Sequence, residues 1–581
     1  MRPVEFGGCF GWLHPAVGSR GVVLCNSFGY EQLSVHRVWR GLADQFAAAG
    51  LPALRFDWHG SGDSVGDYTD PERVQAWLES VRGAVARLRA ETGVSEVALV
   101  GLRLGATLAA LVAEELGDVE ALALLAPVVS GKAYVREMRA LSAFGRSSAA
   151  PPAGADDGEM EAAGFVMSAS TLAEVRQIDL MATVQHAPAR RVLLMHRPDA
   201  PTDARLAARL GELGAETQET SIEGYSGFVC DSEFSQPPRA AFDLLVEWVG
   251  RGAKKQEIPF DPPCSKPVRM RLAGAVEEPV ELAGRARLIA TACTPTVPPT
   301  GGTGENDRPA LIFLNTGWYV RAGANRMAVT MARRCAARGF TSLRLDLAGV
   351  GDSDDAPEGD SVVYNLKSCT DVSVAIDWLA ARGHRRVVLF GICSGAYLSF
   401  QAAYRDPRIV GQILVNADHF EWTERDTIKM SQRTVGRGAR QLIGIGLRAI
   451  FDLGKLRRIL SGDPVAVGLA RAASQRSVQA LRRRLGAAAD TPAARHMREM
   501  LNRHVKTLLV FSTLDMGLAE CRHQFGPEFD LVGKSEYLQL EIIDDASHTL
   551  AERRSRAALT VLLDKFLEPW AAAPAPAVRA A

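Results

Sequence analysis

Two short turns of this chain share a glycine frame but carry different side chains at their centres. Residues 101–105 read Gly-Leu-Arg-Leu-Gly, and residues 391–395 read Gly-Ile-Cys-Ser-Gly. Each turn follows an apolar run and precedes small residues, which is the strand–turn–helix context that exposes a nucleophile. The central residue is Arg103 in the first turn and Cys393 in the second. A thiolate can attack a carbonyl carbon and a guanidinium cannot, so only the second turn can support acyl transfer.

Acyl transfer through a thiol also needs a base and a carboxylate that orients the base. Asp515 follows the strand-like run 507–511, while His548 follows the run 538–543 and precedes a helical pattern. We therefore predict a triad of Cys393, His548 and Asp515, with the positive end of the helix after the turn favouring a thiolate. The alternatives are that Cys393 is a buried apolar residue and that His548 is an ordinary surface histidine.

Other titratable residues fit these roles less well. His419, His504 and His523 do not follow a late strand and precede a helix, as a triad histidine should. Asp544 and Asp545 are closer in sequence to the predicted base than Asp515 is. We interpret these two carboxylates as capping or solvating their loop.

Two backbone N–H groups should stabilise the negative charge that develops on the substrate oxygen. The first is expected from Ser394, which lies one residue past the apex and is not itself the nucleophile. The second should come from the loop after the strand that ends at Asn315, where Gly317 and Trp318 are the candidates. Glycine permits close approach of the backbone to a ligand.

The chain repeats itself at a nearly constant spacing. Asn26 and Asn315 are 289 positions apart, as are Asp57 and Asp346, and the two glycine-framed turns are 290 apart. Strand-like and helical patterns alternate in the same order within both copies. This alternation predicts two α/β domains, each with a mostly parallel sheet flanked by helices.

The sequence also indicates where the domains begin and end. We predict a first domain over residues 1–250, and a Pro-rich linker with the opening strands of the second domain over residues 251–308. The second domain follows over residues 309–570, with a helical lid at about 420–503. The Ala/Pro-rich tail, residues 571–581, is expected to be disordered.

The first copy lacks the groups that a triad needs. Arg103 replaces the nucleophile, and residues 221–238 hold no histidine where the base should lie. His186 and His196 fall too early, so Asp199 alone remains. We predict a degenerate domain, in which Arg103 either binds an anionic group or, as we favour, forms a salt bridge that fills the dead site.

The insertion in the second copy is strongly basic. Between Arg425 and Arg503, fifteen Arg and two Lys accompany five acidic residues, which gives a net charge of +12. One interpretation is a peripheral contact with an anionic membrane surface or an anionic substrate. The other, which we favour, is a lid whose arginine face is solvated.

Composition excludes several classes of function. The chain has 581 residues, with 67 Lys and Arg balanced by 67 Asp and Glu, so global charge gives no reason to expect nucleic acid. No run approaches the ~18 apolar residues of a transmembrane helix, and no signal-peptide pattern opens the chain. None of the nine cysteines forms a C-x-x-C pair, so neither a zinc site nor a disulfide framework is predicted. We expect a cytoplasmic protein that needs no metal or organic cofactor.

These motifs resemble the α/β-hydrolase superfamily in its serine-aminopeptidase-like branch, over residues 1–250 and 265–570. More narrowly, the Arg-centred turn and residues 321–326 (Arg-Ala-Gly-Ala-Asn-Arg) resemble hydrolases associated with exosortase A systems. Cys-centred relatives such as dienelactone hydrolases and polyhydroxyalkanoate synthases imply hydrolysis or acyl transfer on an ester or thioester. The substrate would then be a small-molecule or carrier-bound acyl group.

A non-catalytic protein with two degenerate domains, serving as a binding or scaffold protein, is the competing hypothesis. The two hypotheses differ in whether Cys393, His548 and Asp515 converge.

Overall fold

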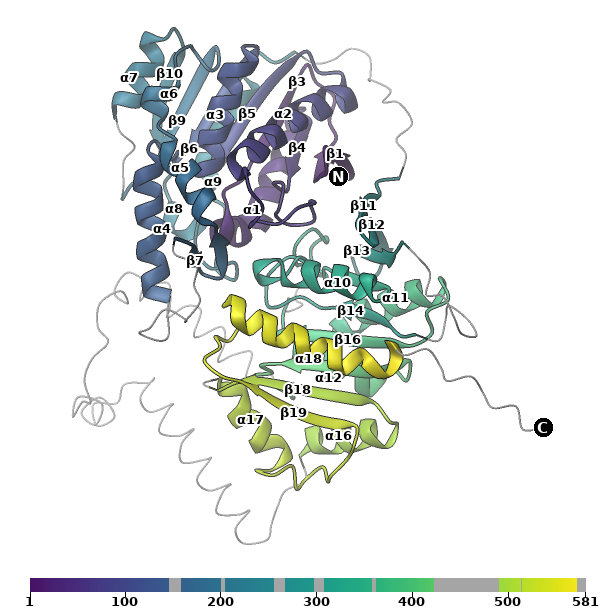
Figure 1. The fold of residues 1–581 in the computed structure, drawn as a ribbon. Coiled ribbons are helices and arrows are strands. Elements are labelled where there is room, and N and C mark those ends of the chain that lie inside the picture. Colours follow the sequence, from purple (N-terminus) through teal and green to yellow (C-terminus); the bar gives the residue numbers. More distant parts are fainter. Residues whose placement is uncertain are drawn as a thin grey trace, which may run out of the picture.

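The computed structural model describes residues 1–145, 158–199, 204–254, 267–296, 308–357, 362–422, 491–513 and 515–571. Within these ranges the chain forms two α/β domains, each built on one large sheet, and Figure 1 shows the first domain above the second. The predicted fold class is thereby confirmed. Most of the predicted lid and nearly all of the predicted tail lie outside the described residues.

The first sheet has eight strands in the order β1-β2-β4-β3-β5-β6-β9-β10. The strands are β1 (Arg2–Phe6), β2 (Cys9–His14), β3 (Arg20–Cys25), β4 (Ala53–Phe56), β5 (Glu96–Leu102), β6 (Val119–Leu125), β9 (Arg191–His196) and β10 (Glu216–Ser221). Pairing is antiparallel from β1 to β4 and parallel across the rest. A separate hairpin joins β7 (Met160–Ala162) and β8 (Phe165–Met167).

The helices of the first domain are α1 (Gly29–Ala48), α2 (Arg73–Thr92), α3 (Leu104–Leu116), α4 (Gly131–Gly145), α5 (Ala169–Gln177), α6 (Leu180–Thr183), α7 (Ala204–Glu212), α8 (Tyr225–Phe228) and α9 (Arg239–Gly250). Alternate residues of the buried strand β3 face opposite sides of the sheet. Val22 and Leu24 pack with α1 and α9, whereas Val23 and Cys25 pack with α2 and α3. The sheet therefore has a hydrophobic core on each face, as a parallel sheet covered by helices requires.

The second sheet has nine strands in the order β11-β12-β13-β15-β14-β16-β17-β18-β19. The strands are β11 (Met270–Leu272), β12 (Ala275–Ala283), β13 (Arg287–Pro295), β14 (Ala310–Phe313), β15 (Ser342–Leu345), β16 (Val387–Ile392), β17 (Ile409–Val415), β18 (Lys506–Ser512) and β19 (Leu538–Ile543). Strands β11 to β15 pair antiparallel, and the strands from β15 to β19 pair parallel. From β12 onwards this sheet repeats the strand order of the first.

The helical segments of the second domain are η1 (Ala324–Arg326), α10 (Met327–Ala337), η2 (Leu366–Ser368), α11 (Cys369–Ala380), α12 (Ser394–Arg405), α16 (Pro492–Asn502), α17 (Met516–Phe525) and α18 (Arg553–Ala571). Helices α10 and α18 contribute to the core on one face of the sheet, and α11, α12, α16 and α17 to the core on the other. Among the described residues, no helix is long and apolar enough to cross a membrane.

The two domains also share a small apolar cluster. Phe10 and Trp12 of β2 pack with Met270 of β11 and Ile289 of β13. All four side chains are more than nine-tenths buried. The antiparallel edges of the two sheets therefore meet through buried contacts.

Candidate active site

Cys393 lies at the sharp turn between β16 and α12. Its backbone has φ of 57° and ψ of −116°, a strained conformation for a residue other than glycine. A side chain at Gly391 would place its Cβ 2.1 Å from the carbonyl carbon of Gly395, and a side chain at Gly395 would place its Cβ 2.6 Å from the carbonyl oxygen of Asn315. Both flanking residues must therefore be glycine for the turn to close and present the thiol.

His548 and Asp515 meet although they are 33 positions apart. His548 Nδ1 lies 2.6 Å from Asp515 Oδ2. The other carboxylate oxygen of Asp515 accepts a hydrogen bond from the Gly517 N–H at 2.8 Å and so caps α17. The Asp515 side chain is only 3% exposed, which fixes the carboxylate and leaves the Nε2 edge of the imidazole for another partner.

The sulfur of Cys393 lies beside this imidazole. The Cys393 sulfur, a carboxylate oxygen of Asp418 and a ring nitrogen of His548 all lie within 4.8 Å of one another. Burial by itself lowers the pKa of His548, but hydrogen bonds to Asp515 and Cys393 outweigh burial and raise this pKa to about 11. A protonated imidazole next to the sulfur stabilises a thiolate, which is the reactive form.

The same three groups could also hold a metal ion. A thiolate, an imidazole and a carboxylate are ligands that Zn²⁺ accepts, and three protein ligands leave one position open. The Nε2 atom of His548 lies 3.7 Å from the nearer oxygen of Asp418. A bound ion would occupy the sulfur and the imidazole that the triad needs, so the two uses of this site are mutually exclusive.

An aromatic group covers the thiol. The hydroxyl of Tyr364 lies 3.4 Å from Cys393 Sγ, and its ring stacks on Trp422 with 4.3 Å between ring centroids. The ring of His419 meets the Tyr364 ring edge-on at 5.3 Å. Burial, and then the charge of Cys393, raise the pKa of Tyr364, so its hydroxyl stays neutral and can donate a hydrogen bond.

Three residues of this site were not among those predicted from the sequence. Asp418 follows β17 as Asp515 follows β18, so its place at the carboxyl end of a parallel strand was a usable signal. Tyr364 and Trp422 lie in loops, where no periodic pattern marks them.

The predicted oxyanion loop lies close to the start of α12. The Gly317 N–H donates to the Ser394 hydroxyl at 2.8 Å, and Asn315 Nδ2 donates to the carbonyl of Tyr319 at 2.9 Å. Ser394 begins α12, so its own N–H belongs to the first turn, whose amides have no partner within the helix. Because Ser394 already accepts from Gly317, Trp318 remains the candidate for the second oxyanion donor.

Residues that competed for the triad roles lie in other surroundings. His419 belongs to the aromatic group over the thiol, and His504 stacks on Tyr537 with 4.8 Å between ring centroids. Asp544 accepts a hydrogen bond from Thr513 Oγ1 at 2.6 Å. These contacts place the loop carboxylate and both rings in roles other than supporting the imidazole beside Cys393.

The first domain keeps the turn but has an arginine at its centre. Arg103 has φ of 55° and ψ of −124°, nearly the backbone conformation of the Cys-centred turn. Its Nε lies 3.0 Å from a carboxylate oxygen of Glu31, and a terminal nitrogen lies 2.6 Å from one of Glu137. Asp199 is paired with Arg197 at 3.0 Å. The guanidinium of Arg103 is thus neutralised within the domain, which supports the salt-bridge interpretation over anion binding.

Comparison with known families agrees with the repeated architecture. Residues 29–184 match the family described as serine aminopeptidase, S33, and residues 311–561 match the family described as alpha/beta hydrolase. The chain is a tandem α/β-hydrolase protein. No curated protein matches this tandem hydrolase.

Solved structures similar to the tandem α/β-hydrolase protein share little sequence with it. A hypothetical protein from Pseudomonas aeruginosa has 16% identity and a TM-score of 0.32, over 51% of this chain and 94% of its own. An esterase from Pyrococcus furiosus has 13% identity and a TM-score of 0.33, over 51% and 92%. A thermophilic esterase from Thermogutta terrifontis has 18% identity and a TM-score of 0.30, over 51% and 100%.

Proposed function

We propose that the second domain cleaves an ester or thioester by transferring its acyl group to Cys393. The observation that carries this proposal is the contact of His548 with both Asp515 and Cys393 at a turn that exposes the sulfur. A thiol, an imidazole and a buried carboxylate in this order form the relay used for nucleophilic catalysis. Because the same relay occurs on many unrelated folds, the proposal rests on the geometry of these three residues and not on the family.

The first step forms an S–C bond between Cys393 and the substrate carbonyl carbon. Negative charge develops on the carbonyl oxygen, where the N–H groups of Ser394 and Trp318 would stabilise it. The bond to the leaving alcohol or thiol then breaks, and the leaving group takes a proton from His548 Nε2. Asp515 holds Nδ1 and stabilises the imidazolium while it carries that proton.

The second step releases the acyl group. Water, or an alcohol or amine acceptor, loses a proton to His548 and attacks the thioester carbonyl carbon. The C–S bond breaks, and the thiolate returns beside the imidazolium. Water gives hydrolysis and the other nucleophiles give acyl transfer, so the acceptor decides which reaction the protein performs.

Tyr364 is placed to assist this chemistry. Its hydroxyl lies 3.4 Å from the sulfur, within hydrogen-bonding distance for a thiolate acceptor. A neutral phenol that donates to the thiolate would hold the sulfur in one position before attack. The stacked ring of Trp422 keeps the phenol in place and gives the acyl group an apolar wall.

Intact-mass spectrometry after exposure to activated acyl esters and thioesters tests the proposal. The full chain should gain one acyl mass on Cys393, and Cys393→Ala should gain none. His548→Ala should acylate slowly, while His504→Ala, in which the altered histidine stacks on Tyr537, should behave as the wild type. A wild-type chain that gains no acyl mass from any donor would favour the competing hypothesis of a non-catalytic tandem protein.

A further inference from the structure

The two domains meet through equivalent loops that exchange charged partners. Arg55 of β4 donates to Asp352 of the second domain at 2.7 Å. Arg344 of β15, which lies 289 positions after Arg55, pairs with Asp63 of the first domain, which lies 289 positions before Asp352. The four side chains are each at most 6% exposed. The exchange is reciprocal, as across the twofold axis of a symmetric dimer.

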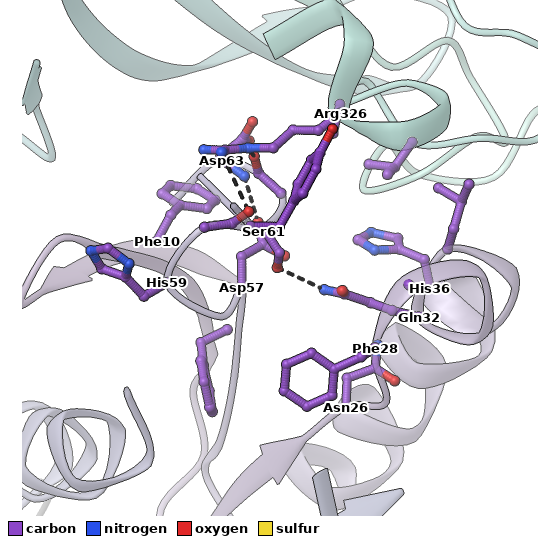
Figure 2. Close-up of a pocket in the computed structure, with 18 of the residues that line it drawn as sticks. Phe10, Asn26, Phe28, Gln32, His36, Asp57, His59, Ser61, Asp63 and Arg326 are labelled. Atoms are coloured by element: carbon purple, nitrogen blue, oxygen red, sulfur yellow. Dashed lines mark hydrogen bonds between the residues drawn. The ribbon is translucent and has the colours of Figure 1, made fainter. Parts of the chain in front are cut away.

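One arginine breaks this symmetry. Arg321 of the second domain corresponds to Gln32 of the first, since they are 289 positions apart. The guanidinium of Arg321 donates to Asp63 at 2.7 Å, to Asp352 at 2.7 Å and to Asp346 at 2.9 Å. Gln32 donates instead to the Ser61 hydroxyl of its own domain at 3.3 Å (Figure 2). At this position the pairing is one-sided, because Arg321 of the second domain reaches a carboxylate of the first, whereas Gln32 bonds within its own domain.

Arg321 belongs to the loop that carries the predicted oxyanion donors. Its backbone N–H donates to Asp346 Oδ1 at 2.6 Å, and Asn315 Nδ2 donates to the same oxygen at 3.0 Å. The amide of Asn315 also holds the carbonyl of Tyr319. A continuous set of buried hydrogen bonds thus leads from Asp63 through Arg321 and Asp346 to both ends of the segment 315–321.

The next residues of the second domain are also held by the first. Arg326 is 6% exposed, and its guanidinium donates to the carbonyls of Gly62 at 2.8 Å, Gly66 at 2.5 Å and Ser64. Figure 2 shows Arg326 above the loop that bears Asp63. A cavity of about 120 Å³ lies at this junction, lined by residues from both domains. The loop from Arg321 to Arg326 is therefore held by the first domain at both of its ends.

The position of Tyr319 agrees with this arrangement. Burial, and then the charges of Asp231 and Cys393, raise the pKa of Tyr319 to about 12. Asp231 belongs to the first domain, where it also accepts a hydrogen bond from Tyr30 at 3.2 Å. The side chain of Tyr319 is therefore near a carboxylate of the first domain as well as near the thiol.

We propose that Asp63 of the degenerate domain is a positioning residue for the oxyanion loop of the second domain. This inference rests on the proposed acyl transfer at Cys393. The carboxylate of Asp63 fixes Arg321, and Arg321 and Asp346 fix the loop, so that the Trp318 N–H points to the carbonyl oxygen of the substrate. A dead domain then contributes to catalysis without touching the substrate.

The test compares two reactions of the same thiol. Alkylation by iodoacetamide displaces iodide and develops no oxyanion, whereas acylation by an activated ester does. In Asp63→Asn, Arg321 loses the one first-domain carboxylate among the three that orient it. The rate constant for acylation should fall about 10- to 100-fold with KM within about twofold, because a misplaced donor weakens the transition state and not substrate binding. The rate of alkylation should stay within about twofold of the wild type.

Asp354→Asn is the matched control. Asp354 also pairs across the boundary, with Arg40 at 3.0 Å, but it makes no contact with Arg321 among those observed. Its acylation and alkylation rates should both equal those of the wild type. If Asp63→Asn does not fold, Arg321→Lys keeps the charge with fewer donors and should give the same separation of the two rates.

The outcomes distinguish this inference from the proposed function. A wild-type chain that is not acylated at all overturns the proposed function. A wild-type chain that is acylated, with Asp63→Asn acylated equally fast, overturns the positioning role alone. A parallel loss of acylation and alkylation in Asp63→Asn also overturns it, because the defect would then lie in the thiol or in the fold.

Discussion

Selective alkylation of Cys393 is the most direct consequence of the contact between its sulfur and His548. Burial raises the pKa of Cys369 to about 11, and it does the same for Cys9. Each pKa unit is a factor of ten, so about one of these thiols in 10⁴ is ionised at pH 7. The contact of Cys393 with the imidazole of His548 instead stabilises the reactive thiolate form.

The expected rate ratio stays below the factor of about 10⁴ that the suppressed ionisation of the buried thiols would allow. An ion-paired thiolate is a weaker nucleophile than a basic one, which removes one to two of the four powers of ten. Iodoacetamide at pH 7 should therefore label Cys393 about 10²-fold faster than Cys369, with the sites assigned by peptide mass mapping over time. His548→Ala should remove most of this advantage, whereas His504→Ala should keep it.

Two results would refute the reasoning. Labelling of Cys393 no faster than that of Cys369 would mean that the imidazole does not stabilise a thiolate. An equally fast reaction in His548→Ala would mean that the helix start alone activates the sulfur. Either result would remove His548 from the proposed relay.

Because the pKa of His548 is raised to about 11, the imidazolium persists from pH 7 to 9. The kcat/KM for an ester should therefore fall only as the pH rises towards 11. With an ordinary imidazole, kcat/KM would fall already near pH 6.5. Micromolar Zn²⁺ should inhibit acylation and EDTA should restore it, because Cys393, His548 and Asp418 offer three ligands to the ion. Unchanged activity in the presence of Zn²⁺ would contradict this prediction. Arg321→Met should lower the free energy of unfolding in urea by about 3–5 kcal/mol, because it leaves the buried carboxylate of Asp346 without the arginine that pairs with it. Arg334→Met, at a half-exposed ion pair, should lower it by no more than about 1 kcal/mol, and equal losses would refute the difference. Arg103→Cys in a chain that lacks the second-domain thiol should give no ester turnover, because the observed partners of Arg103 in the described part of the chain include no histidine. Measurable turnover would show a base that we have not identified.

The architecture was predictable because its signals are local and repeated. The glycine frames around Arg103 and Cys393, and the constant spacing of 289 to 290 residues, identify two copies of one fold. His548 and Asp515 were predictable as a pair because each follows a strand, and parallel strands bring such positions to one edge of the sheet. Only the structure shows that His548 Nδ1 lies 2.6 Å from Asp515 Oδ2.

Other parts of the site left no pattern in the sequence. Tyr364 reaches the thiol from a loop in which it adopts a φ of 54°, a conformation that no periodicity indicates. Asp63 and Arg321 are 258 positions apart and belong to different domains. A contact between two separate sheets depends on how the sheets dock, and neither copy of the motif encodes that docking by itself.

The reciprocal pairing of Arg55 with Asp352 and of Arg344 with Asp63 has a consequence for the history of the chain. If two identical subunits once met through this surface, each would have braced the oxyanion loop of the other. After fusion into one chain, selection could act on the two loops separately. It was then sufficient for the first domain to support the oxyanion loop of the second. The first domain could then lose its nucleophile and its histidine, but it had to keep the carboxylate of Asp63, which holds Arg321 of the second domain. Substitutions at Asp63 should therefore be tolerated only together with changes about 260 residues away.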